Sequence, residues 1–325
     1  MKKTILFCFL FGCVLSINAQ QMELVQLQDV QIRFASGKEA QVFLKTEDAF
    51  LLNLSPFDRS ARLKTNKNVN HAGFLQFITK QTMNWDSGEK DKINAIVKRI
   101  ITSASGYNLL FPSEIVFVKT TGKEEGNAAY CRSANVVVLP ARFTALPADR
   151  LYRLVFHELF HVFSRNNPEI QEKLYEIVSY KKCRELKIPE DLFNRKITNP
   201  DAVQNNYFFS AGINGNTYTL MPILLASSNY DQKKGGEFFD YLELYFIAVT
   251  ESGNNMVPML ENGKYILFTL EQVPGYLDLV GKNTDYIIHP EEIMADNFVF
   301  LLNNARNLPN MEILEKMRKV LQVYL

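Results

Sequence analysis

The chain has 325 residues, of which 47% are hydrophobic and 22% are charged, so it is neither a small module nor a disordered protein. Its 36 basic residues balance 35 acidic ones, which excludes the strong positive charge typical of nucleic-acid-binding proteins. Only four histidines and four cysteines are present, so any place where they cluster is informative.

Residues 1–19 have the composition of a secretory signal. Two lysines precede an apolar run over 5–15 that is too short to span a membrane, and Ala19 ends a suitable cleavage site. The sequence therefore predicts an exported protein, periplasmic or extracellular, whose mature chain is 20–325. The alternative is a lipoprotein signal with the lipid on Cys13, although Phe11 fits that motif poorly.

The mature chain contains no repeat, low-complexity tract or flexible linker, which predicts one α+β domain of two lobes. In chain order, we expect strands within 22–56, a helix over 91–105, a strand over 115–118, two strands within 127–140, and helices over 147–166 and 169–185. Strands are expected next at 207–209, 217–226, 238–250 and 264–272, and then helices over 290–304 and 311–325. No stretch after the signal is long enough to be a transmembrane segment.

Two cysteines, Cys131 and Cys183, remain after the signal is removed. In an oxidising compartment they could form a disulfide, but two cysteines do not make a disulfide framework. Two unpaired thiols that pack as small hydrophobic side chains are the favoured interpretation.

Two of the four histidines lie in the motif His157-Glu158-Leu159-Phe160-His161, inside the helix expected over 147–166. A spacing of four residues places both imidazoles on one face of a helix, where they can bind one Zn²⁺ ion. Glu158 is next to a ligand and can act as general base on a water molecule. The alternative is a helix with two hydrogen-bonded histidines and no metal.

This motif resembles the active-site helix of the zincin metallopeptidases, and the resemblance implies an α+β zincin-like core with a mixed sheet. The metzincin extension is absent, because Ser164 and Asn167 stand where it needs glycine and histidine. The gluzincin branch supplies a third ligand from a later helix, in the pattern Glu-x-x-x-Asp. After His161, only Glu292 and Asp296 form that pattern.

On this resemblance, Glu292 would bind the metal and Asp296 would hold a ligand histidine in place. One alternative is that Glu291 and Glu292 only complement the dipole of their helix. A competing ligand is Glu176, which has Tyr180 at the position of the aspartate.

Glu292 follows His161 by 131 residues, which is longer than gluzincins usually show. The strand-rich stretch 207–272 is therefore expected as an insertion between the two metal-binding helices. The resemblance also implies a sheet edge that binds substrate backbone, for which we expect Asn135–Leu139. Tyr286 and His289 are candidate donors to a developing oxyanion, the alternatives being core packing and a helix N-cap.

Together these features predict a secreted zinc peptidase. Zn²⁺ held by His157, His161 and Glu292 would activate water, and Glu158 would be the general base. A peptide or protein is the expected partner. The alternatives are a secreted zinc-containing binding protein without turnover and a zinc hydrolase that acts on a non-peptide bond.

Overall fold

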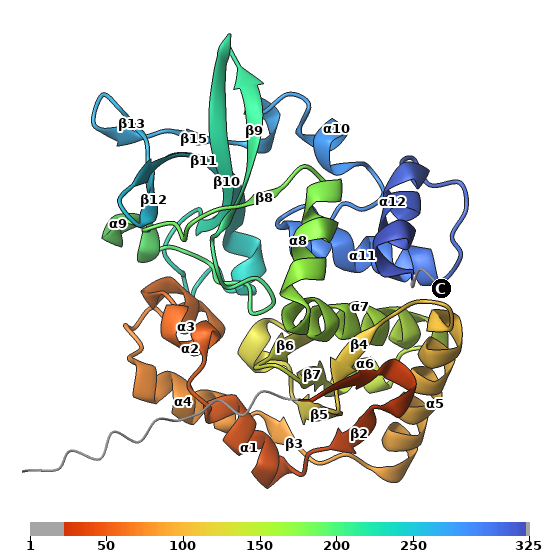
Figure 1. Ribbon diagram of the computed structural model, residues 1–325. Coiled ribbons are helices and arrows are strands. Elements are labelled where there is room, and N and C mark those ends of the chain that lie inside the picture. Colours follow the sequence, from red (N-terminus) through yellow and green to blue (C-terminus); the bar gives the residue numbers. More distant parts are fainter. Residues whose placement is uncertain (1–22, 323–325) are drawn as a thin grey trace, which may run out of the picture.

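The computed structural model describes residues 23–322, so the predicted signal at 1–19 and its lipoprotein alternative at Cys13 lie outside the described residues. The chain folds as a mixture of helices and strands, with one main sheet in each half (Figure 1). The predicted α+β class is confirmed at this level. Among the described residues, no helix has the length and apolar character needed to cross a membrane.

The first sheet is mixed and has the strand order β2-β5-β7-β6, with β3 paired to β5. The strands are β2 (Gln31–Phe34), β3 (Thr82–Met83), β5 (Glu114–Thr120), β6 (Tyr130–Arg132) and β7 (Val136–Pro140). β5 is parallel to β2 and β7, whereas β6 is antiparallel to β7. The prediction that Asn135–Leu139 is the edge strand is wrong: Ser133 adopts a left-handed turn conformation that folds β6 along the outer side of β7.

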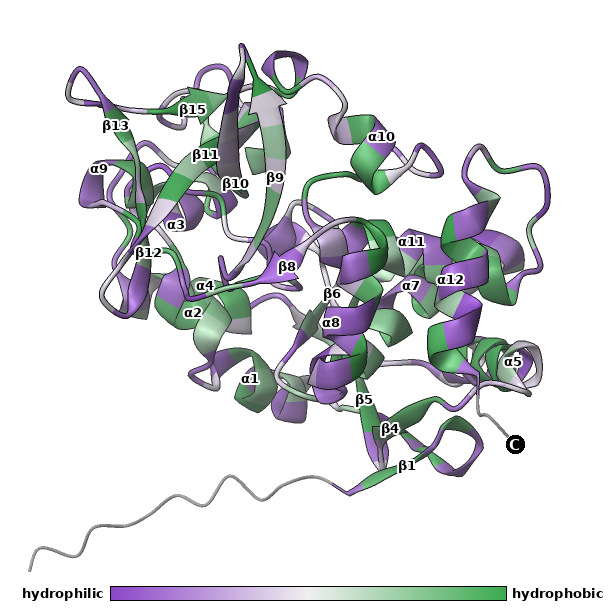
Figure 2. Ribbon diagram, turned by 45° about the horizontal axis from the view of Figure 1, so that its top comes forward, coloured by the Kyte–Doolittle hydropathy of each residue, from purple (hydrophilic) through white to green (hydrophobic). Residues whose placement is uncertain are grey.

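Helices cover both faces of this sheet, because its central strands are apolar on both sides. In β5, Ile115 and Phe117 belong to the core that includes α5 (Ser87–Ala104) and α7 (Ala148–Asn166). The alternate residues Val116 and Val118 belong to a second core, and Figure 2 shows β5 in the colour of hydrophobic residues. That core is closed by α1 (Gly37–Lys45), α2 (Ala49–Asn53) and α4 (His71–Thr79). The short helix α3 (Pro56–Arg62) follows α2, and the short helix α6 (Ala141–Thr144) follows β7.

The strands predicted within 22–56 are confirmed only as β1 (Leu24–Gln26), which pairs with β4 (Leu110–Pro112), and as β2. The rest of that stretch forms α1 and α2. Ser36 and Glu39 make a capping box at the start of α1, and Asp48 caps α2. These local helix-start signals outweigh the short apolar runs.

The second sheet is antiparallel, has the order β12-β11-β10-β9-β8, and confirms the strand-rich character of 207–272. Its strands are β8 (Lys181–Lys182), β9 (Tyr207–Ile213), β10 (Asn216–Ala226), β11 (Leu242–Ser252), β12 (Asn255–Pro258) and β15 (Leu267–Phe268), the last paired to β11. A small hairpin, β13 (Leu260–Glu261) and β14 (Lys264–Tyr265), lies beyond β12 in the chain. The strand expected to begin at 238 begins at Leu242, after a 3-10 turn.

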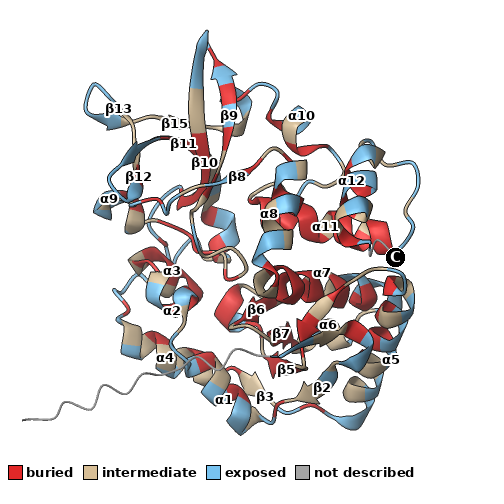
Figure 3. Ribbon diagram, in the orientation of Figure 1, coloured by how far each residue is buried: buried red, intermediate tan, exposed pale blue. Residues whose placement is uncertain are grey.

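The remaining helices are α8 (Pro168–Ile177), α9 (Glu190–Phe193), α10 (Tyr276–Val280), α11 (Pro290–Leu302) and α12 (Met311–Leu321). α8 ends well before the predicted 185, because Ser179 takes a left-handed conformation that leads into β8. α11 is buried on nearly all sides (Figure 3), as expected for a helix with apolar residues around its whole circumference. Cys131 and Cys183 are unpaired, which confirms the favoured interpretation.

A buried ion network holds the segment that follows α9 against the first half of the chain. Arg62 forms salt bridges of 2.5 Å with both Asp58 and Glu125. The Arg62 guanidinium also donates to the backbone carbonyl of Thr198 (3.1 Å). The backbone N–H of Thr198 donates in turn to Asp58 Oδ1 (3.1 Å). Segment 196–201 is therefore fixed in place next to the residues described below.

Glu124 lies beside this network, and its Oε2 atom has no hydrogen-bond partner among the described residues. Burial raises the pKa of Glu124 from 4.5 to about 7. Between these values the folded protein keeps a proton that the unfolded chain releases, so stability falls as the pH rises through this window. We expect Glu124→Gln to remove this pH dependence and to raise the free energy of unfolding above neutral pH by up to about 3 kcal/mol.

Urea denaturation at about pH 5 and about pH 8 checks this prediction, because the two conditions lie on either side of most of the titration. Glu261→Gln, on the exposed strand β13, is the control and should leave the pH profile unchanged. The same pH profile in Glu124→Gln as in the wild type would contradict the prediction.

Candidate metal centre

Helix α7 holds the histidine motif in a buried, aromatic environment. Phe156 and Phe160, which directly precede the two histidines, both pack on Phe298 of α11 with ring centroids 5.2 Å apart. These contacts fix α7 against α11. The two helices that carry the predicted ligands are therefore in direct contact, although 131 residues separate His161 from Glu292.

The three predicted ligands converge. His157 Nε2 lies 3.1 Å from Glu292 Oε2, and His161 Nε2 lies 3.5 Å from the same oxygen. One ligand atom from each of these residues lies within 4.8 Å of the other two. The competing Glu176 is exposed on α8 and is not part of this group.

The second nitrogen of each imidazole contacts a carboxylate from α11. His157 Nδ1 lies 3.0 Å from Asp296 Oδ1, where the sequence predicted a partner, and Thr284 donates to the other oxygen of Asp296. His161 Nδ1 lies 2.8 Å from Glu291 Oε1. Such partners fix which imidazole nitrogen is free to bind a metal.

Sequence reasoning missed the role of Glu291, which was expected only as a charge at the start of a helix. Its Oε2 atom accepts from Ser164 (2.8 Å) and from the hydroxyl of Tyr175. Two ligand histidines one helical turn apart need two separate hydrogen-bond partners for their Nδ1 atoms. The Glu-x-x-x-Asp pattern provides only one of these, Asp296. That requirement is the signal that could have pointed to Glu291.

Segment 194–206 adds two further side chains that the sequence did not reveal. Asn199 Nδ2 donates to Glu292 Oε1 (2.6 Å), which leaves Oε2 facing the two imidazoles. Asp201 accepts from the backbone N–H of Cys131 (2.9 Å) and is largely buried. Neither position belongs to a recognisable sequence motif. Both side chains reach the centre because the long-range network around Arg62 holds this segment in place.

The electrostatics of this centre favour a bound positive charge. Burial opposes protonation of His157, but its hydrogen bonds to Asp296 and Glu292 outweigh that effect and raise its pKa to about 10. The pKa of His161 is also raised, because Asp201, Glu292 and Glu291 outweigh the effect of burial. For Glu292, the two imidazoles outweigh burial and hold the pKa well below its usual range.

Glu158 lies next to the ligands and is only 3% exposed. Burial, followed by repulsion from Asp201, raises the pKa of Glu158 to about 7. A carboxylate with a pKa near neutrality can accept a proton in one step and donate it in the next. The thiol of Cys131 lies 3.5 Å from Glu158 Oε2.

The two predicted oxyanion donors occupy different environments. The ring of Tyr286 lies parallel to His157, with centroids 6.0 Å apart, and 40% of the residue is exposed, so core packing does not account for it. His289 is the N-cap of α11, and its Nδ1 atom accepts from the N–H of Glu291 (3.1 Å). Burial lowers the pKa of His289 to about 4, which keeps it neutral in that role. The N-cap alternative is confirmed for His289.

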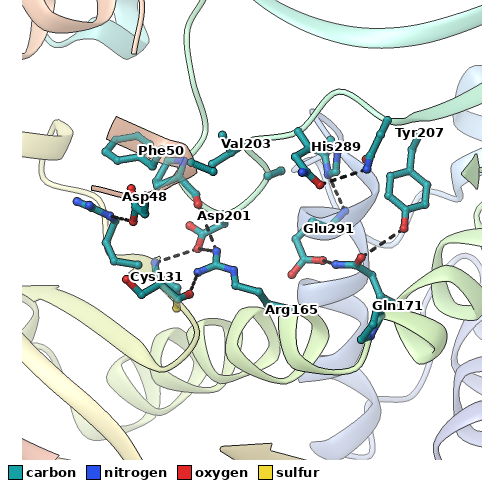
Figure 4. A pocket seen from close by; sticks show the side chains of 18 of the residues that line it. Asp48, Phe50, Cys131, Arg165, Gln171, Asp201, Val203, Tyr207, His289 and Glu291 are labelled. Carbon is teal, nitrogen blue, oxygen red and sulfur yellow. Dashed lines mark hydrogen bonds and ion pairs between the residues drawn. The ribbon is translucent and has the colours of Figure 1, made fainter. Parts of the chain in front are cut away.

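A cavity of about 430 Å³ lies beside this centre, over the C-terminal half of α7 (Figure 4). Cys131 and Asp201 line it on one side, and His289 and Glu291 on the other. The edge strand β6 contributes two lining residues, Cys131 and Arg132, and Tyr207 is the residue of β9 that reaches the cavity. Most other aromatic residues of 207–272 instead pack in the cores.

We expect Glu291→Gln to weaken zinc binding by about 10–100-fold, because an amide holds the N–H of His161 less strongly than a carboxylate does. Isothermal titration of metal-free protein with zinc measures this loss. Glu312→Gln is a matched control, since Glu312 is an exposed acid in the first turn of α12. Equal losses in both variants would mean that Glu291 acts only through the helix dipole.

Comparison of the chain with protein-family models, with curated proteins and with solved structures found no match.

Proposed function

We propose that this protein is a zinc-dependent peptidase with a zincin-like core, exported from the cell. The observation that carries the proposal is the convergence of both Nε2 atoms on one oxygen of Glu292, while each Nδ1 atom contacts its own carboxylate. With Zn–N of about 2.0–2.1 Å and Zn–O of about 2.0–2.2 Å, a tetrahedral site separates nitrogen and oxygen ligands by about 3.3–3.5 Å. The 3.5 Å separation falls in this range, and the 3.1 Å separation is about 0.2 Å shorter than its lower end.

His157, His161 and Glu292 would hold the zinc, which when bound would acidify a water molecule and polarise the scissile carbonyl. Glu158 takes the proton from the attacking water and transfers it to the leaving amine. Repulsion from Asp201 helps Glu158 to retain that proton between the two steps. Tyr286, stacked beside His157, is placed to donate to the negative charge that develops on the carbonyl oxygen.

A peptide substrate is supported by the cavity beside β6. The cavity of about 430 Å³ is large enough for a bulky side chain of a peptide. The similarity to gluzincins in the two metal-binding motifs supports the same substrate class.

Metal removal tests the proposal. We expect the wild-type protein to cleave members of a mixed peptide library, to lose all cleavage after chelation and dialysis, and to regain it with one equivalent of zinc. His71→Ala should behave as the wild type, because His71 pairs with Glu47 (2.7 Å) on the surface. Full cleavage by zinc-free protein would refute the metal-dependent mechanism.

A further inference from the structure

A second group of ligand-type side chains lies beside the proposed zinc centre. It comprises Cys131 on β6, Glu158 on α7 and Asp201 in segment 194–206, and one ligand atom of each lies within 4.8 Å of the others. Cys131 is fully buried, and the side chain of Asp201 is 7% exposed. This group shares no member with the three proposed zinc ligands.

The separations within this group fit a thiolate and a carboxylate on one zinc ion. Zn–S of about 2.3 Å and Zn–O of about 2.0–2.2 Å place the two atoms about 3.5–3.7 Å apart at a tetrahedral angle. Cys131 Sγ and Glu158 Oε2 are 3.5 Å apart. The same thiol lies 3.2 Å from the backbone carbonyl oxygen of Glu158 and donates to it, so it is not committed to the carboxylate.

Two carboxylate oxygens of the group form no hydrogen bond or salt bridge with the residues that the structure describes. Glu158 Oε1 has no hydrogen-bond partner among residues 23–322, although Glu158 is 97% buried. Asp201 uses Oδ1 for the N–H of Cys131 and for Arg165 (3.7 Å), while Oδ2 has no partner in the same range. Neither oxygen is among the fully buried atoms that lack a partner in the described residues, so both face space from which a cation can bind them.

The net charge of the region also favours a second bound cation. Five carboxylates surround the two groups of ligands: Glu158, Asp201, Glu291, Glu292 and Asp296. Arg165 is the nearby cation. With all five carboxylates ionised, one zinc ion at the histidines leaves two negative charges in excess. A second divalent ion balances that excess.

We infer that Cys131, Glu158 and Asp201 form a second site for a thiophilic divalent cation such as Zn²⁺. On binding, the Cys131 sulfur forms a bond to the metal and its proton passes to the solvent. Cys131 and Asp201 line the cavity of about 430 Å³, through which the ion would reach the site and water would complete its ligands. This inference rests on the proposed function in one respect: a metal on Glu158 removes the general base, so excess zinc inhibits the peptidase.

Titration of metal-free protein with Co²⁺ tests the site directly. We expect two equivalents to bind, one of them with the near-ultraviolet charge-transfer absorption of a cobalt–thiolate bond. Cys131→Ser should lose that absorption and one equivalent. Cys183→Ser, the control at the other cysteine, should keep both. A single equivalent without thiolate absorption would overturn the inference, as would absorption that disappears only in Cys183→Ser.

A second variant keeps the test independent of the buried cysteine. Asp201→Asn should weaken the thiolate-bound equivalent by at least about tenfold, because a neutral amide replaces a charged ligand. Unchanged affinity for that equivalent would contradict the assignment of Asp201.

The two proposals can fail separately. In His161→Ala, the equivalent without thiolate absorption should disappear and the thiolate-bound one should remain. If the wild type binds cobalt only through thiolate, the proposed zinc centre fails while the second site stands. The expected inhibition is at least about tenfold when zinc exceeds one equivalent, and it should be absent in Cys131→Ser; equal inhibition in that variant would assign it to another site.

Discussion

Glu158→Gln is expected to lower kcat/KM for peptide cleavage by about 10²–10⁴-fold, while one equivalent of zinc stays bound at His157, His161 and Glu292. Glutamine has the same shape but cannot accept the proton of the attacking water. Because Glu158 is not among the three converging ligands, its replacement leaves them in place. Peptide hydrolysis assays with metal analysis of the same samples measure both effects.

Glu176→Gln is the matched control, since Glu176 is an exposed glutamate on the neighbouring helix α8 and should not affect turnover. Cleavage that survives in Glu158→Gln would remove Glu158 from the mechanism. A wild-type protein that binds zinc but cleaves no peptide would favour a binding protein. Hydrolysis of esters or amides without peptide cleavage would instead favour a non-peptide hydrolase.

Glu292→Ala is expected to weaken zinc binding by more than about 100-fold, which exceeds the loss for a residue that only supports a ligand. The change removes one of three ligand side chains and leaves the amide of Asn199 without its acceptor. Inductively coupled plasma mass spectrometry of protein dialysed against trace zinc measures the bound metal. In a helical fold of this kind, circular dichroism shows whether the variant has remained folded.

Glu176→Ala should retain zinc, because the exposed Glu176 does not approach the histidines. Loss of zinc in Glu176→Ala and retention in Glu292→Ala would reverse the choice of third ligand. Retention in both variants would mean that the two histidines bind the metal with a ligand other than these two glutamates.

Residues in regular helices with strong local signals could be predicted from the sequence. α7 and α11 lie where periodicity and the prolines at 147 and 290 placed helices, to within two residues at each end. The relative position of His157 and His161, and of Glu292 and Asp296, follows from helical spacing alone. Their convergence required only that the two helices pack together.

Features that depend on contacts between distant segments could not be predicted. Asn199 and Asp201 reach the centre because Arg62 and Asp58 anchor Thr198, and nothing near position 199 in the sequence signals this. The edge position of β6 depends likewise on strand order, which short apolar runs do not specify. Part of the stretch 22–56, where strands were expected, forms α1 and α2 instead, because Ser36 and Asp48 cap helices there.

The packing of α7 against α11 has a consequence for how the chain folds. A zinc ion held jointly by His161 and Glu292 would close a loop of 131 residues, so the ion acts as a cross-link between the two halves of the chain. Closing a loop of this length is entropically unfavourable, and contacts this distant form late in folding. We therefore expect the proposed metal centre to assemble after both sheets have formed, so that zinc would stabilise the finished fold by mass action rather than guide its first steps.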